Sequence, residues 1–109
     1  MADMEKHKEA IAKYAKSVDN DLVEAMAKTY RLVLSKKDSE YVACGQASEL
    51  ETVRKNFLKK KLGLSFEDAD LDAALADVCA TMKDSKMKSR LAFYYLLVEK
   101  FNAKSVFVK

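Results

Sequence analysis

The sequence contains no proline and only two glycines, Gly45 and Gly63, where average usage predicts roughly five prolines and eight glycines. All-β sandwiches and barrels need many turns, and turns are made largely by glycine and proline. Dinucleotide-binding fingerprints and phosphate-binding P-loops need clustered glycines, which two isolated ones cannot build. The composition therefore argues against an all-β fold and against both kinds of nucleotide-binding motif.

Long apolar runs are also missing. The longest uncharged run near the C-terminus, residues 91–98, is far shorter than the ~18–20 residues that a membrane span requires. Residues 1–6 carry charges where a signal peptide would have its apolar stretch. We therefore expect no membrane association and a cytoplasmic location.

Cysteine and histidine are scarce. Cys44 and Cys79 stand far apart and form no C-x-x-C motif, so in a reducing cytosol we expect two small buried hydrophobic residues. The one histidine, His7, lies among charged residues near the N-terminus and is expected to be a solvated surface residue. A Ser–His or Cys–His nucleophile whose members meet only in space stays open as an alternative. No metal or other cofactor is expected, because metal binding needs several ligands.

Apolar residues recur with the period of a helix almost throughout, which predicts a single all-α domain over residues 1–109. In the second expected helix, for example, Leu22, Met26 and Tyr30 fall on one face. We expect five helices: at about 4–16, from an N-cap at Asp19 or Asn20 to about 35, at 48–62, from an N-cap at Ser65 or Asp68 to about 84, and at 86–101. One or two further helical turns are expected to hold Tyr41, Val42 and Cys44 and to end at Gly45.

The third expected helix carries signals at both ends. Ser48 followed by Glu51 forms a capping box, in which each side chain satisfies a free backbone amide of the other residue. Gly63 fits the left-handed position just past the helix, and Leu64 fits the apolar position that follows it.

The fifth expected helix has no polar face over residues 91–98. A helix that is apolar all round is a buried one, so we expect this C-terminal helix to be central and surrounded by the others. Phe93, Leu96 and Leu97 should be nearly inaccessible. Asn102 can end the helix, and the apolar tail at 106–108 is expected either to dock back or to stay loosely ordered.

Four short segments of the sequence carry a resemblance: KYA at 13–15, ELETVRKNFL at 49–58, KKLGL at 60–64 and FYYLL at 93–97. Together they resemble a family of small bacterial proteins. That family is known as a domain of unknown function, number 2853, and the resemblance covers nearly the whole chain. It implies an all-helical array in which one helix is surrounded by the others. It brings no activity, cofactor or partner.

The acidic run Asp68-x-Asp70-x-Asp72 resembles the start of a calcium-binding EF-hand loop. Ala73 stands where such a loop needs glycine, and Cys79 stands where it needs a bidentate glutamate. We therefore expect these carboxylates to compensate the positive end of the fourth helix dipole.

Two basic segments are the candidate binding sites. The first comprises Arg54, Lys55, Lys59, Lys60 and Lys61. Its charges either complement the negative end of the third helix or form a patch for nucleic acid or an acidic partner. The second comprises Lys83, Ser85, Lys86, Lys88, Ser89 and Arg90.

The second segment places cations at the start of the fifth helix, where they oppose the helix dipole. Amides, hydroxyls and a guanidinium are groups that a phosphate or carboxylate prefers, so an external anion is one interpretation. The other is internal neutralisation by Asp70, Asp72 or Asp77.

The expected function is that of a small non-enzymatic interaction module with a protein partner. The sequence identifies neither that partner nor an oligomeric state. The alternative is anion or nucleic-acid binding through segments 54–61 and 83–90. The net charge of +3, with only three arginines, is small for a committed nucleic-acid binder.

Overall fold

The computed structural model describes residues 4–15, 18–31, 41–83 and 88–108 and confirms the helical fold class. A two-stranded antiparallel sheet is the only β-structure within these ranges. The elements are α1 (Met4–Tyr14), α2 (Asn20–Thr29), β1 (Tyr41–Val42), α4 (Ala47–Thr52), the π-helix η1 (Val53–Lys61), α5 (Asp68–Thr81), β2 (Lys88–Ser89), α6 (Arg90–Phe101) and the 3-10 helix η2 (Lys104–Val106).

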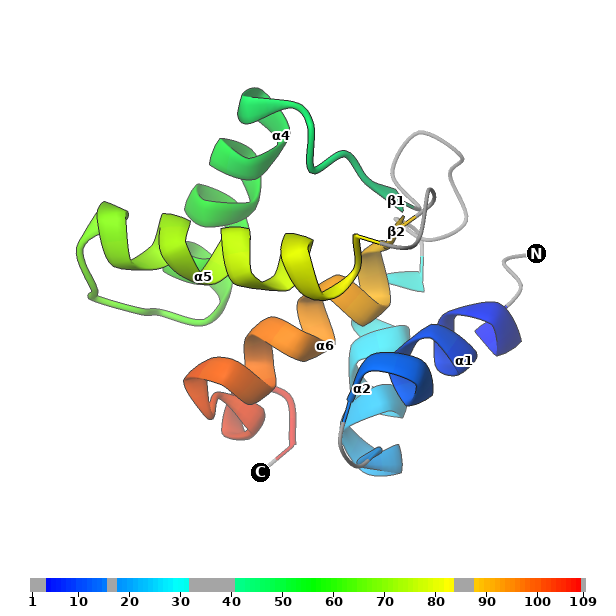
Figure 1. Cartoon of the computed structure of the whole chain (residues 1–109). Helices are drawn as coiled ribbons and strands as arrows, with labels where there is room; N and C mark the ends of the chain where they lie inside the picture. Colours follow the sequence, from blue (N-terminus) through cyan, green and yellow to red (C-terminus); the bar gives the residue numbers. More distant parts are fainter. Residues whose placement is uncertain (1–3, 16–17, 32–40, 84–87, 109) are drawn as a thin grey trace.

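Helix α6 lies at the centre, as its apolar composition predicts. Helices α1, α2 and α5 all pack against it, and Figure 1 shows α6 crossing the middle of the molecule between α5 and the α1–α2 pair. Within residues 91–98 every side chain is buried except Leu96, which is only partly buried. The prediction is therefore confirmed for Phe93 and Leu97 and wrong for Leu96, since α1 and α5 leave that side of α6 partly uncovered.

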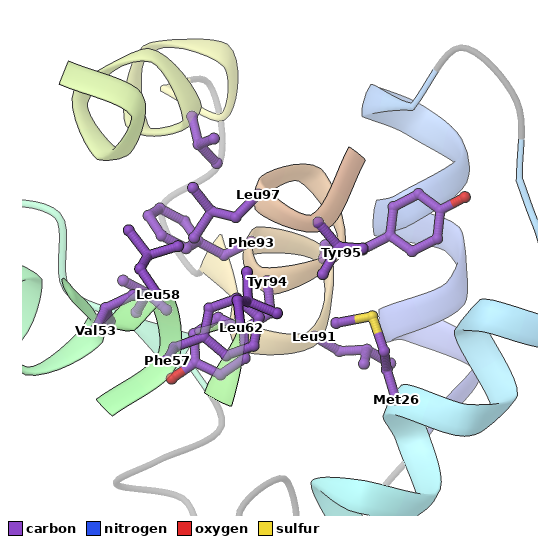
Figure 2. Packing of buried hydrophobic residues seen from close by; sticks show 14 of the residues in the cluster. Met26, Val53, Phe57, Leu58, Leu62, Leu91, Phe93, Tyr94, Tyr95 and Leu97 are labelled. Atoms are coloured by element: carbon purple, nitrogen blue, oxygen red, sulfur yellow. The ribbon is translucent and has the colours of Figure 1, made fainter. Parts of the chain in front are cut away.

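The π-helix covers another face of α6. The ring of Phe57 stacks on Tyr94 with 3.9 Å between centroids, and both belong to the cluster in Figure 2. The C-terminal tail docks here, because Phe107 lies 6.2 Å from the ring of Tyr30 and 6.5 Å from Phe57. Asn102 ends α6 as predicted, and it does so in a left-handed conformation.

The beginning of α6 differs from the prediction. The helix starts at Arg90, and the two residues before it form β2. Tyr41 pairs with Ser89 and Val42 pairs with Lys88, so the helical turns expected around Tyr41 are instead the strand β1. The prediction of helical turns around Tyr41 was wrong because the strand that pairs with it lies far along the chain, where a local pattern does not reveal it. Helix α2 ends at Thr29, whereas the prediction extended it to about residue 35. Residues 32–35 of that prediction lie outside the described residues.

The third expected helix is present but differs in two ways. It begins at Ala47, and Gln46 caps it without a side-chain hydrogen bond, so the predicted capping box at Ser48 is wrong. From Val53 the backbone widens into a π-helix, and near its end the Leu62 amide donates to the Phe57 carbonyl at 2.8 Å. Gly63 follows with φ of 67°, which confirms the predicted left-handed position.

The two cysteines form a disulfide, with 6.0 Å between their Cα atoms. The expectation of two unpaired thiols is therefore wrong. Cys44 lies in the turn after β1 and Cys79 lies on α5, and both are partly exposed. The fold brings these distant residues together, and their spacing in the sequence carries no sign of it.

Candidate functional site

The second basic segment does not form one continuous surface patch. Ser89 is 4% exposed, and its hydroxyl accepts a hydrogen bond from the Ala92 amide at 3.3 Å, so it caps α6. Arg90 is 8% exposed. Lys83 is exposed after α5, and Lys88 is partly buried in β2. Two members of the segment, Ser85 and Lys86, lie outside the described residues.

Arg90 points into the protein, where the described residues Tyr94, Tyr41 and Glu49 hold it. Its guanidinium donates to the Tyr94 hydroxyl at 2.9 Å, to the Tyr41 carbonyl at 3.3 Å, and to the Glu49 carboxylate in a short ion pair. Burial opposes the charge, but Tyr94 and then Glu49 outweigh it, so the pKa of Arg90 lies above its ordinary value.

The charge of Arg90 is thus neutralised from inside, as one of the two interpretations anticipated. The acid that does so is Glu49 of α4, not one of the three candidates on α5. Asp72 instead binds Arg54, and Asp77 pairs with Lys100.

His7 contradicts its sequence-based prediction, since its exposed fraction is 0%. Its Nδ1 atom lies 2.5 Å from the Ser89 hydroxyl, and its ring lies 6.3 Å from that of Tyr41. The spacing from His7 to the buried Ile11 is one helical turn, a signal that could have placed the histidine on the inner face of α1.

The His7–Ser89 pair joins α1 to the first turn of α6. A serine nucleophile must reach a substrate, whereas this hydroxyl is buried and already accepts the Ala92 amide. The geometry therefore fits a structural link between helices.

The first basic segment is largely paired with acidic neighbours. Arg54 Nη1 lies 2.8 Å and 3.0 Å from the two carboxylate oxygens of Asp72, which raises the pKa of Arg54. Lys59 pairs with Asp68 and thereby lowers the pKa of that carboxyl group. The first two turns of α5 thus supply counter-charges for the π-helix, and the start of α5 at Asp68 leaves no loop for the calcium motif.

Three lysines complete this first segment. Lys55 pairs with Glu51 at 2.7 Å, one turn earlier on the same face. The ammonium group of Lys61 lies 5.2 Å from the ring centre of Phe107, within the range of a cation–π contact. Lys60 is exposed.

A groove of about 440 Å³ lies where α1, α5 and α6 meet. Leu96 belongs to its lining, together with Ala15, which directly follows α1, and Val78 of α5. An ion pair of 3.0 Å between Asp77 and Lys100 borders it. The groove therefore combines apolar side chains with charged ones at its margin. Its remaining lining residues are Tyr14, Thr81 and Glu99.

The described residues form neither a candidate metal site nor a helix that could cross a membrane. They contain no group of three or more histidine, cysteine or acidic side chains placed to hold a metal ion. None of their helices is both long and apolar enough to cross a membrane.

Comparison with known proteins identifies a family. No curated protein sequence matches the chain. The model of DUF2853, a family described as protein of unknown function, matches residues 5–105. The match spans almost the whole chain, in agreement with the motifs of its middle and C-terminal parts. The chain therefore belongs to the DUF2853 family.

Proposed function

We propose that this protein is a non-enzymatic interaction module that binds an amphipathic helix of a protein partner in the groove between α1, α5 and α6. One observation carries the proposal. Leu96 is the single residue of the apolar run 91–98 that the fold buries only in part, and it lies in this groove.

The composition of the groove suits such a ligand. Leu96, Ala15 and Val78 offer an apolar surface for the apolar face of a helix. The Asp77–Lys100 pair at the margin offers both signs of charge to the polar flanks of the ligand. An apolar contact with a polar rim is the usual anatomy of a protein–protein interface.

Anion or nucleic-acid binding through the basic segments has less support. Arg54, Lys59 and Arg90 already have carboxylate partners, so their charges are partly compensated within the protein.

The cytoplasmic location remains part of our proposal. The Cys44–Cys79 disulfide weighs against that location, because disulfides are rare in reducing compartments.

The test compares capture of partners from the lysate of the native cell by wild-type protein, Leu96→Lys and Val18→Lys. Val18 is 38% exposed and lies outside the groove, so it is a matched control for an added lysine. We expect a protein that is bound by wild type and Val18→Lys at both low and high salt and is lost with Leu96→Lys. Circular dichroism checks that both variants fold.

The captured protein is then titrated into isotopically labelled wild-type protein. We expect amide shifts to concentrate at 14–15, 77–81 and 96–100, the lining of the groove. Equal capture by Leu96→Lys would refute the groove. Capture that disappears at high salt or after nuclease treatment would instead support the nucleic-acid alternative, since phosphate contacts weaken steeply with ionic strength.

A further inference from the structure

The disulfide encloses a defined part of the fold. Cys44 precedes α4 by three residues and Cys79 is two residues from the end of α5, with a separation of 35 residues. The chain between them contains α4, the π-helix η1 and most of α5. The bond therefore closes these elements into one ring.

Within that ring, α4 and α5 face each other across a cleft of about 330 Å³. On α5 the lining residues Asp72 and Ala76 share a face with Cys79, since the three lie one helical turn apart in succession. The Arg54–Asp72 ion pair crosses the cleft, and the disulfide lies one turn beyond Ala76. The cleft is thus bridged by an ion pair toward one end and by a covalent bond toward the other.

Helix α4 depends on these bridges because its own packing is weak. It has six residues, none of them buried, and no side-chain cap at its first turn. Leu50 is only partly buried, and it lines the same cleft. Segments with few buried apolar contacts are those that open locally while the rest of a protein stays folded.

We propose that the Cys44–Cys79 bond is a redox-sensitive clasp that holds α4 against α5, and that its reduction raises the local opening of residues 44–52 while α6 stays folded. The core around α6 does not require the bond, because Phe93, Leu97 and Tyr95 are buried among other helices. Reduction leaves Glu49, Arg90 and the β1–β2 pairing chemically unchanged, so the opened segment can close again and re-form the Glu49–Arg90 ion pair.

The reaction is an ordinary thiol–disulfide exchange with a dithiol reductant. One thiolate attacks a cysteine sulfur, the S–S bond breaks and a mixed disulfide forms. The second thiolate of the reductant then displaces the remaining cysteine. Two electrons and two protons pass to Cys44 and Cys79, and the reductant leaves as its own disulfide. Partial exposure of both cysteines is compatible with this attack, and disulfides of reducing compartments are usually transient or redox-sensing.

The experiment measures amide hydrogen exchange of the full chain before and after treatment with dithiothreitol. The double variant Cys44→Ser with Cys79→Ser, measured with and without the reductant, is the control. We expect exchange within 44–52 to accelerate at least tenfold in the reduced wild type and in the variant, with 91–98 unchanged. Reductant should have no effect on the variant, and reoxidation of wild type should restore protection.

Three results would overturn the proposal. The first is complete alkylation of both cysteines in protein that was never exposed to reductant, since no disulfide would then exist. The second is an unchanged exchange rate within 44–52 after reduction. The third is equal acceleration of 44–52 and 91–98, because the bond would then stabilise the whole fold and not one segment.

Discussion

Replacing Glu49 by glutamine tests whether the ion pair at the start of α6 holds α4 on the core. The Glu49 side chain is 21% exposed and that of Arg90 is 10% exposed, so the pair is mostly withdrawn from water. Glutamine keeps the size of the side chain and one acceptor oxygen but removes the charge. It leaves the buried guanidinium without the Glu49 carboxylate.

The magnitude follows from this burial. Hydrogen bonds to charged groups contribute about 1.5–3 kcal/mol, and breaking a fully buried ion pair costs about 3–5 kcal/mol. Glu49 keeps some contact with water, so we expect Glu49→Gln to lower the free energy of unfolding by about 2–3 kcal/mol. For a domain of this size that corresponds to a fall in Tm of about 10 °C.

The matched control is Glu51→Gln, two residues along the same helix. Glu51 pairs with Lys55 at 2.7 Å, but both side chains are more than half exposed. Exposed pairs contribute little because water and salt screen them. The two variants change the net charge equally, but Glu49 loses a mostly buried pair with Arg90 and Glu51 loses an exposed pair with Lys55.

Urea denaturation followed by circular dichroism gives both free energies, with unchanged m-values as the check on two-state behaviour. A double-mutant cycle with Arg90→Met should show favourable coupling to Glu49, because the second change removes the charge that the first one strands. Equal destabilisation by the two glutamine variants would refute the reasoning, as would a coupling energy of zero.

Three further predictions follow from burial, backbone conformation and titration. Leu97→Ala should cost about 2–5 kcal/mol in urea denaturation and Leu96→Ala clearly less, because only the first side chain is fully buried; similar costs would contradict the partial exposure of Leu96. Gly63→Ala should cost about 1–2 kcal/mol for its φ of 67° alone, since among the described residues nothing beyond the chain neighbours lies within 4 Å of an added Cβ, whereas Gly45→Ala should be neutral or slightly stabilising. The reverse order would contradict the left-handed turn. The pKa of Asp19 lies below its ordinary value of 3.8 because of Lys104 and the Leu22 amide, so the contribution of Asp19 to stability is complete above about pH 4 and is lost as pH falls through the lowered pKa. The variant Asp19→Asn should therefore flatten the acid limb of a Tm-against-pH curve. An unaltered acid limb would count against the Asp19–Lys104 ion pair.

Features that depend on neighbours in the sequence could be predicted. The apolar run in α6 predicted a central helix because its composition alone requires burial on every side. Gly63 and Asn102 marked helix ends because few residues adopt a left-handed conformation. The cap of α2 was predicted at Asp19 or Asn20, and Asp19 accepts the Leu22 amide at 3.2 Å.

Features that depend on distant partners could not be predicted. Tyr41 and Val42 form a strand only because residues 88–89 pair with them. The partner of His7 is Ser89, which lies 82 residues away along the chain, where no local pattern reveals it. Arg90 looked like part of a basic surface because nothing in its own segment reveals Glu49.

The capping box at Ser48 failed for a different reason. The required residues are present, but the helix begins at Ala47, so Ser48 lies inside its first turn. The disulfide likewise depends on how α5 lies across the chain after β1. The arrangement of helices could therefore be predicted from the sequence more readily than the contacts that define the candidate sites.

The central position of α6 also sets an order of events during synthesis. Ribosomes make proteins from the N-terminus, so α1, α2 and α5 emerge before the helix that they surround. Until α6 is made, the faces of these helices that pack against it in the folded protein stay uncovered. The contacts between α1 and α6 also close a loop of most of the chain, which makes them costly to form early. A nascent chain stalled before Arg90 would therefore expose the apolar faces of its helices. A holding chaperone would bind the largest apolar surface at that stage.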